Sequence, residues 1–152
     1  MPELPIATVL TSDKRPVHMS ITPEQITELV DTFYGRIHDD ARLGPIFARH
    51  ITGDWPDHLA KMKGFWRSVL LKTGEYHGRP VPAHIKITDL STDDFHHWLE
   101  LFRQTVDEIF EPGARPLVVT AAERIASSLW LAINPTLYSE QPDWRVDAGS
   151  ER

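Results

Sequence analysis

The chain has 152 residues, the length of a single domain, and its 41% hydrophobic and 25% charged residues are typical of a soluble globular protein. It contains no cysteine, which excludes disulfides, thiolate metal sites and cysteine nucleophiles. The net charge of −6 argues against nucleic acid as a partner, and the sequence shows neither an apolar run of about 20 residues nor a signal peptide. We therefore expect a cytoplasmic protein that does not enter a membrane.

The two ends of the chain lack sustained hydrophobic periodicity and contain several prolines. Segments of this kind are seldom ordered unless something ties them down. We expect a flexible N-terminal arm over residues 1–19, one folded domain over residues 20–134, and a flexible C-terminal tail over residues 135–152.

The first helix is predicted to begin at Thr22-Pro23-Glu24-Gln25, where a capping hydroxyl precedes a proline and an amide side chain follows three residues after the cap. Its apolar residues recur with a period of 3.6, and the helix should end near Asp39 or Asp40. The next segment, Leu43-Gly44-Pro45-Ile46-Phe47, is short and interrupted, so it predicts a turn followed by a single helical turn. The apolar stripe of the first helix comprises Ile26, Val30, Phe33, Tyr34 and Ile37.

Three further helices are predicted from the same combination of caps and apolar spacing. The second begins at Gly53-Asp54-Trp55-Pro56, the third at Ser91-Thr92-Asp93-Asp94, and the fourth near Pro116, ending at Asn134-Pro135. Residues 73–90 form a long loop with no clean period, and such loops are often functional. The stripes are His58, Met62, Phe65, Trp66 and Val69 on the second helix; Phe95, Trp98, Phe102, Val106 and Ile109 on the third; and Val118, Ala122, Ile125, Leu129, Ala132 and Ile133 on the fourth. The sequence thus predicts an all-α domain with four main helices and no strands.

Any metal in a chain without cysteine would be bound mainly by histidine, and eight histidines are present. On the third helix, His96 and Glu100 have the i, i+4 spacing of a metal-binding pair. A carboxylate-bridged metal bundle takes ligands from several helices, however, and no second pair of this kind occurs. Four histidines fall in predicted termini or loops, where solvent exposure is the simple explanation: His18, His38, His50 and His77.

Three polar side chains, Tyr34, His58 and Trp98, fall on the inner stripes of three different predicted helices. Each alone is more often an ordinary core residue. Together they place a hydroxyl donor, an imidazole and an indole donor in a core that should avoid unsatisfied polar groups. A flat, apolar cofactor with a metal centre would suit such a site, and His84 in the long loop would approach the metal from the opposite side.

These residues resemble the group III truncated haemoglobins, a bacterial family with a shortened globin fold. The resemblance extends from about Ile21 to Asn134, and its motifs occur in the order and spacing typical of the family. The motifs are Phe33-Tyr34, Leu43-Gly44-Pro45-Ile46-Phe47, His58 followed by Phe65-Trp66 and Leu70-Leu71, Tyr76-x-Gly78-x-Pro80-x-x-x-His84, and Trp98-Leu99-x-Leu101-Phe102. The resemblance implies a truncated globin-like two-over-two helical sandwich that binds haem b.

The resemblance also implies a role for each candidate side chain. His84 would be the proximal ligand of the haem iron, Tyr34 and Trp98 would line the distal pocket, and His58 would stand at its entrance. A single axial histidine leaves one iron position open for O₂, NO or CO. The other expected haem contacts are Phe33, Phe47, Met62, Phe65 and Trp66, and the candidate cations for the haem propionates are Lys61, Arg67, Arg79 and Lys86.

Three functions remain open at this point. The first is a carrier or sensor, monomeric or weakly dimeric, that reversibly binds a diatomic ligand. The second is a haem enzyme that acts on reactive nitrogen or oxygen species by NO dioxygenation or peroxide reduction, with a reductase as a partner. The third is a helical interaction module, in which the stripes are only core and Trp55 and Trp144 mark an exposed partner surface. This third function leaves the inward Tyr34, His58 and Trp98 unexplained.

Overall fold

The computed structural model describes residues 15–50, 54–74 and 90–144, and within these ranges every regular element is helical. The prediction of an all-α domain is confirmed. The elements are α2 (Pro23–Asp39), α3 (Leu43–His50), α4 (Trp55–Leu71), α6 (Thr92–Ile109), α7 (Arg115–Ile133) and the short 3-10 helix η1 (Tyr138–Glu140).

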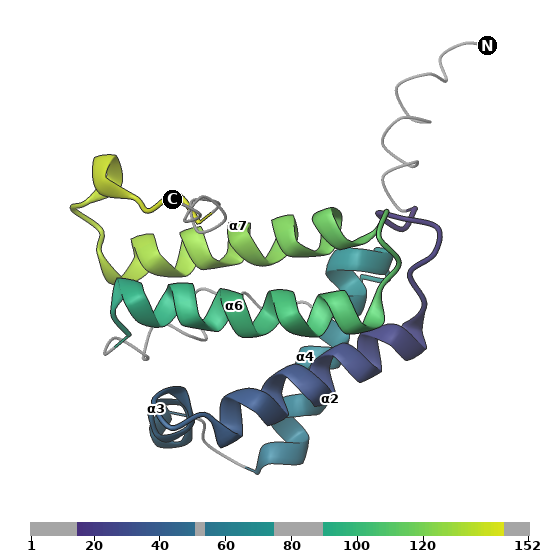
Figure 1. Cartoon of the computed structure of the whole chain (residues 1–152), viewed down its shortest axis with the longest axis horizontal. Helices are drawn as coiled ribbons and strands as arrows, with labels where there is room; N and C mark the ends of the chain where they lie inside the picture. The colour runs from purple at the N-terminus through teal and green to yellow at the C-terminus, as the bar shows by residue number, and fades with distance from the viewer. Residues whose placement is uncertain (1–14, 51–53, 75–89, 145–152) are drawn as a thin grey trace.

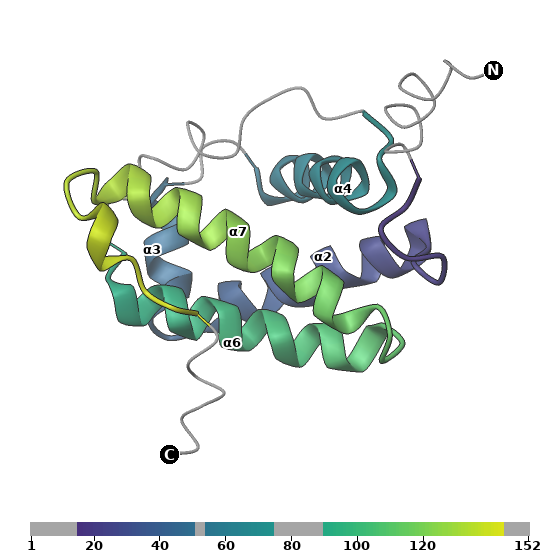
Figure 2. The same cartoon turned by 90° about the horizontal axis from the view of Figure 1, so that it is seen from above.

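The long helices form two pairs that cross each other. Helices α6 and α7 lie side by side, and α2 packs against both α6 and α4 (Figure 1). The short helix α3 lies at the end of α2 both in this view and in the view from above (Figure 2). The pair α2 and α4 thus packs on the pair α6 and α7, which is the two-over-two sandwich expected from the sequence.

Local capping interactions determine where three of the long helices, α2, α4 and α6, begin. Thr22 and Gln25 form a reciprocal capping box at the start of α2, with the Gln25 N–H donating to Thr22 Oγ1 at 3.1 Å. The Asp54 carboxylate accepts a backbone N–H of the first turn of α4, also at 3.1 Å. Ser91 and Asp94 form a second reciprocal box at the start of α6. All three starts agree with the sequence prediction.

Helix α3 differs from the predicted single helical turn, because it extends over eight residues. Asp40 stabilises its start: one carboxylate oxygen accepts the backbone N–H groups of Arg42 at 3.0 Å and Leu43 at 2.8 Å. Gly44 lies so close to the end of α2 that a Cβ added there would collide with the His38 carbonyl oxygen. The glycine that suggested a turn in the sequence therefore allows this helix to pack tightly against α2.

The core between the two pairs is rich in aromatic rings. The ring of Phe33 lies edge to face with Tyr34 and Phe102, with ring centres 5.0 Å apart in both cases, and with Trp98 at 5.5 Å. Trp66 stacks on Phe102 at 5.3 Å. Such contacts contribute about 0.5–1.5 kcal/mol each beyond the burial of apolar area, and they favour specific ring orientations. This cluster holds side chains of α2, α4 and α6 in fixed relative positions.

The last described segment, residues 135–144, packs against the domain, and we call it the C-terminal strap. Trp144 is 4% exposed, and its ring lies 5.8 Å from that of Phe95 on α6. Its indole N–H donates to Ser127 Oγ at 2.8 Å, and its carbonyl accepts from Arg103 at 2.9 Å. The prediction that Trp144 is exposed is wrong, because one well-bonded aromatic side chain can secure a segment that has no periodicity.

The described end of the predicted N-terminal arm also contacts the domain. The Val17 N–H donates to the Leu70 carbonyl at 3.0 Å, at the end of α4. Among the histidines expected on the surface, His38 is exposed, whereas His18 is half-buried and accepts the Ser20 N–H at 3.1 Å. The side chains of the two others, His50 and His77, lie outside the described residues.

Helix α7 is long and apolar enough to cross a bilayer by length and composition, although the sequence was expected to contain no such run. The core helix of a globular domain meets the same criterion. In this structure α7 packs along α6 and buries five residues in the core: Val118, Ala122, Ala126, Leu129 and Trp130.

Candidate functional site

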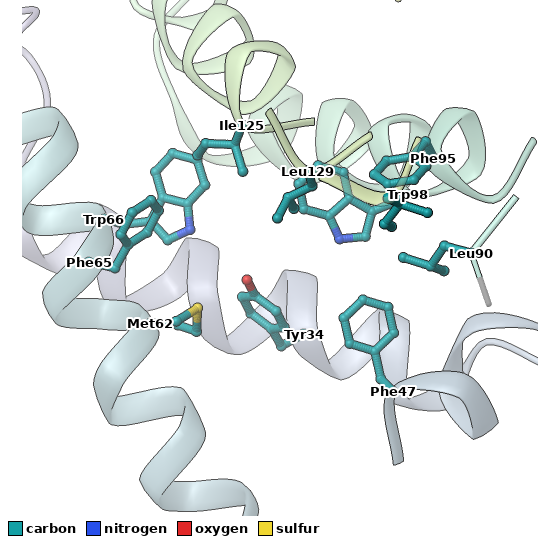
Figure 3. A pocket seen from close by; sticks show the side chains of 11 residues that line it. Tyr34, Phe47, Met62, Phe65, Trp66, Leu90, Phe95, Trp98, Ile125 and Leu129 are labelled. Atoms are coloured by element: carbon teal, nitrogen blue, oxygen red, sulfur yellow. The ribbon is translucent and has the colours of Figure 1, made fainter. Parts of the chain in front are cut away.

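A cavity lies where α2, α3, α4, α6 and α7 converge. It contains about 650 Å³ of space not filled by protein atoms, part of it open to solvent. Six side chains that the sequence predicted as haem contacts line it together, and Figure 3 shows them around a common space: Tyr34, Phe47, Met62, Phe65, Trp66 and Trp98.

The polar atoms of the described lining belong to three side chains from three helices. The hydroxyl of Tyr34 on α2 points into the space between the indole nitrogens of Trp66 on α4 and Trp98 on α6 (Figure 3). The other described lining side chains carry neither nitrogen nor oxygen. The cavity is therefore apolar, with one cluster of hydrogen-bonding groups.

The Tyr34 hydroxyl is buried, and this determines its protonation. Burial raises the pKa of the hydroxyl well above its usual value, and a hydrogen bond from the Trp66 indole opposes the shift only in part. Tyr34 thus keeps its proton throughout the physiological pH range and can donate it in a hydrogen bond.

Two predicted site residues lie beside the described lining of the cavity. Phe33 is behind the wall, where its ring supports those of Tyr34 and Trp98. His58 is half-buried, with its ring 5.6 Å from the ring of Tyr34 and 5.6 Å from that of Trp55. Trp55 is itself half-buried, so it does not form the exposed surface expected for an interaction module. His58 thus connects the cavity residue Tyr34 with the start of α4.

Sequence reasoning did not assign five lining residues to the site. Three of them lie on α7 with a spacing of four residues, and this spacing was recognised only as a core stripe. The other two lie just before α6 and in its first turn. The five are Leu90, Phe95, Ile125, Leu129 and Ile133. For Phe95 the sequence does contain an indication, because it precedes the predicted site residue Trp98 by one helical turn and so lies on the same face of α6.

The described residues that line the cavity do not form a metal-chelating site. Within the described ranges, no group of three or more His, Asp or Glu side chains is close enough to hold a metal ion. His84, the predicted iron ligand, and the propionate candidates Arg79 and Lys86 lie outside the described residues. The described lining does fit a haem, because aromatic and aliphatic walls suit a flat apolar cofactor and a few placed donors suit its ligand.

No protein-family model matches the chain. The chain is 33% identical over 111 residues to the group 3 truncated hemoglobin ctb of Campylobacter jejuni, a match that covers 71% of this chain and 87% of that protein. It is also similar to the crystal structure of the group III truncated hemoglobin from Campylobacter jejuni, with a TM-score of 0.68 and 30% identity, over 83% of this chain and 98% of the other. Because sequence and fold agree over nearly the whole relative, the chain belongs to the group III truncated haemoglobins and is a globin-type haem protein.

Proposed function

We propose that the protein reversibly binds a diatomic ligand, O₂, NO or CO, at a haem b in the cavity, with His84 as the only protein ligand of the iron. The observation that carries this proposal is the convergence of Tyr34, Trp66 and Trp98 in an otherwise apolar space. A haem held there by a single histidine would supply an iron that can bind a further, diatomic ligand. The assignment of His84 is supported by its spacing from Tyr76 in the sequence motif.

The described lining offers hydrogen-bond donors to a ligand. An indole N–H can only donate, and the buried Tyr34 hydroxyl retains its proton. A bound ligand that carries partial negative charge, as O₂ does, accepts such bonds strongly, whereas CO accepts them weakly. The arrangement of Tyr34 and Trp98 therefore favours retention of O₂ over CO.

The apolar side chains of the cavity contribute by excluding water. Met62 and Phe65 on α4 and Leu129 on α7 are buried or nearly so and face the same space. A hydrogen bond is electrostatically stronger where water is absent, so these side chains increase the effect of the donors. They also slow oxidation of the iron by limiting access of water.

One observation favours reversible binding over peroxide chemistry. Within the part of the chain that the structure describes, Tyr34 is the one titratable side chain that lines the cavity, and burial disfavours release of its proton. A peroxidase-like reaction needs a group that gives up and takes back a proton near the operating pH. The described lining provides hydrogen bonding without such a group.

A visible absorption spectrum of the purified protein tests the proposal. We expect haem absorption that changes on reduction with dithionite and again on addition of CO, and that is restored when CO is removed. Protein that is colourless after expression with added haem precursor would overturn the proposal. Sustained turnover of peroxide, or of NO with O₂ and a reductant, would replace reversible binding with the enzymatic alternative.

A further inference from the structure

The three donors in the cavity are not equivalent, because one of them acts on another. Trp66 and Tyr34 are 2% and 4% exposed, and Figure 3 shows the indole nitrogen of Trp66 turned toward the Tyr34 hydroxyl. The Trp66 N–H is thus directed at that oxygen as a hydrogen-bond donor, and it lowers the pKa of the Tyr34 hydroxyl against the effect of burial. The indole nitrogen of Trp98 lies on the other side of the hydroxyl.

The donor and acceptor capacity of these groups determines where the Tyr34 proton can go. A phenol has one proton and two acceptor lone pairs, and an indole N–H cannot accept. Neither Trp66 nor Trp98 can therefore receive the Tyr34 proton. The remaining described lining side chains have no nitrogen or oxygen, so the proton is available to a ligand inside the cavity.

Packing keeps the Trp66 indole in the orientation that allows this bond. Its ring stacks on Phe102 at 5.3 Å with an angle of 27° between the planes, and meets Phe65 edge to face at 5.4 Å. Tyr34 is held in turn by Phe33, edge to face at 5.0 Å. Neither ring can turn away without disturbing the aromatic core, so the orientation of the Trp66 N–H toward Tyr34 is set before a ligand arrives.

We propose that Trp66 is a positioning residue for ligand binding: by donating to the Tyr34 oxygen, it orients the Tyr34 proton toward the ligand and makes it a stronger donor. Hydrogen bonds in a chain polarise one another, so the bond that Tyr34 receives strengthens the bond that it gives. The inference rests on the proposed function and deepens it. Trp66 acts through Tyr34 and does not need to touch the ligand.

A double-mutant cycle of Trp66→Phe and Tyr34→Phe, made in the haem-loaded protein, separates this role from simple packing. Trp66→Phe alone should speed O₂ dissociation roughly fivefold, the scale expected for weakening one hydrogen bond. In the Tyr34→Phe background the same substitution should have almost no effect, because the group through which Trp66 acts is gone. In the Trp98→Phe background the effect should persist, since Tyr34 is still present. The CO stretching frequency gives a readout that is independent of any turnover, and it should shift with the same pattern.

Additive effects of the two substitutions, or an unchanged O₂ dissociation rate in Trp66→Phe, would overturn this inference and leave the proposed function intact. Parent protein without haem would instead overturn the proposed function itself. If Trp66→Phe does not fold, indole N–H signals in ¹⁵N-labelled parent and Tyr34→Phe proteins provide the same test. Loss of the hydroxyl should move the Trp66 signal upfield and speed its exchange with solvent, and an unmoved signal would contradict the hydrogen bond.

Discussion

The Arg42 guanidinium donates two parallel hydrogen bonds to Asp94, from Nε to Oδ1 and from Nη2 to Oδ2, each 2.8 Å long. The pair connects the start of α3 with the start of α6, where Asp94 also accepts the Ser91 N–H at 2.9 Å. The hydrogen bonds from Arg42 are the largest cause of the low pKa of Asp94, about 2. Burial of the carboxyl group acts in the opposite direction and raises this pKa. The next residue, Phe95, lines the cavity, so this pair positions part of the site.

This pair predicts how stability changes in acid. A carboxyl group whose pKa is lowered in the folded state stabilises the fold above its unfolded pKa, and that contribution is lost as the pH falls from about 4 to 2. Asp94→Asn should therefore unfold at a lower urea concentration than the parent near neutral pH. We expect its free energy of unfolding to be lower by about 1–2 kcal/mol, since solvent partly screens the exposed Arg42 side chain. The difference from the parent should shrink toward pH 2. Asp93→Asn, at an exposed neighbouring position, is the control, and a constant difference for Asp94→Asn from pH 6 to pH 2 would contradict the assignment.

Two glycines in adjacent helices should respond to alanine with opposite signs. Gly44→Ala should destabilise the fold by about 1–3 kcal/mol, because the new Cβ forces α3 away from the His38 carbonyl. Gly35→Ala in α2 meets no atom within 4 Å and should stabilise by up to about 1 kcal/mol through helix propensity. Thermal unfolding of both variants measures the two changes. Equal shifts in the same direction would show that the approach of α3 to α2 is not tight.

Removal of His84 should remove the cofactor. His84→Ala is expected to lose haem during purification, or to bind it only with added imidazole, because no other protein ligand of the iron is proposed. His96→Ala is the matched control, since it removes the histidine of the alternative i, i+4 pair with Glu100. Haem content per chain, measured from the spectrum, gives the result. Full haem content in His84→Ala together with an unchanged spectrum would show that the iron ligand lies elsewhere.

The distal donors should control how long O₂ stays bound. Tyr34→Phe and Trp98→Phe each remove one hydrogen bond of about 1–3 kcal/mol, which corresponds to roughly 5- to 150-fold faster O₂ release. CO release should change much less, because CO accepts hydrogen bonds weakly. Stopped-flow measurements with both ligands test this. Parent-like O₂ rates in both variants would exclude a hydrogen-bonding role for the cluster.

His58 should act as a pH-dependent gate, and the structure supplies an interaction that can hold it aside. An imidazole changes charge near pH 6.5, and a protonated ring is attracted to an indole face. The ring of His58 already lies 5.6 Å from that of Trp55, tilted by 31°. CO rebinding after flash photolysis should therefore speed up from pH 8 to pH 5. His58→Ala should be fast at every pH, and Trp55→Leu should weaken the pH dependence.

Parallel pH profiles for the parent and His58→Ala would show instead that His58 only packs against Tyr34. Histidines of the core are commonly satisfied by such a partner. The Trp55→Leu variant separates the two cases further, because a packing role for His58 predicts a change in stability without a change in the pH profile.

Helix positions could be predicted from the sequence where the deciding interaction is local. The caps Thr22, Asp54 and Ser91 each contact a residue within the next turn, so their motifs are visible in the sequence. Helix α3 was underestimated because its start depends on Asp40 and on close approach to α2, which no short motif records. The burial of Trp144 could not be predicted for the same reason, because its partners Ser127 and Phe95 are far away in the sequence.

The site could be predicted in part, because its polar residues are unusual at the positions that they occupy. A tyrosine, a histidine and a tryptophan on inner stripes invite a functional explanation, whereas Ile125 and Leu129 look like any other core residues. Only the position of α7 along the cavity distinguishes them. Apolar residues of a cofactor pocket and of a solid core follow the same periodicity, so the sequence cannot separate them.

The walls of the cavity come from both ends of the described chain, with Tyr34 and Phe47 near its beginning and Leu129 and Ile133 near its end. During synthesis at about 5–20 residues per second, the aromatic half on α2, α3 and α4 leaves the ribosome several seconds before the half on α7. Until α7 is released, the lining side chains of α2, α3 and α4 lack the cover that α7 provides in the folded domain. The pocket can enclose a cofactor only after α7 has been released, which makes cofactor insertion a late step in the formation of this domain.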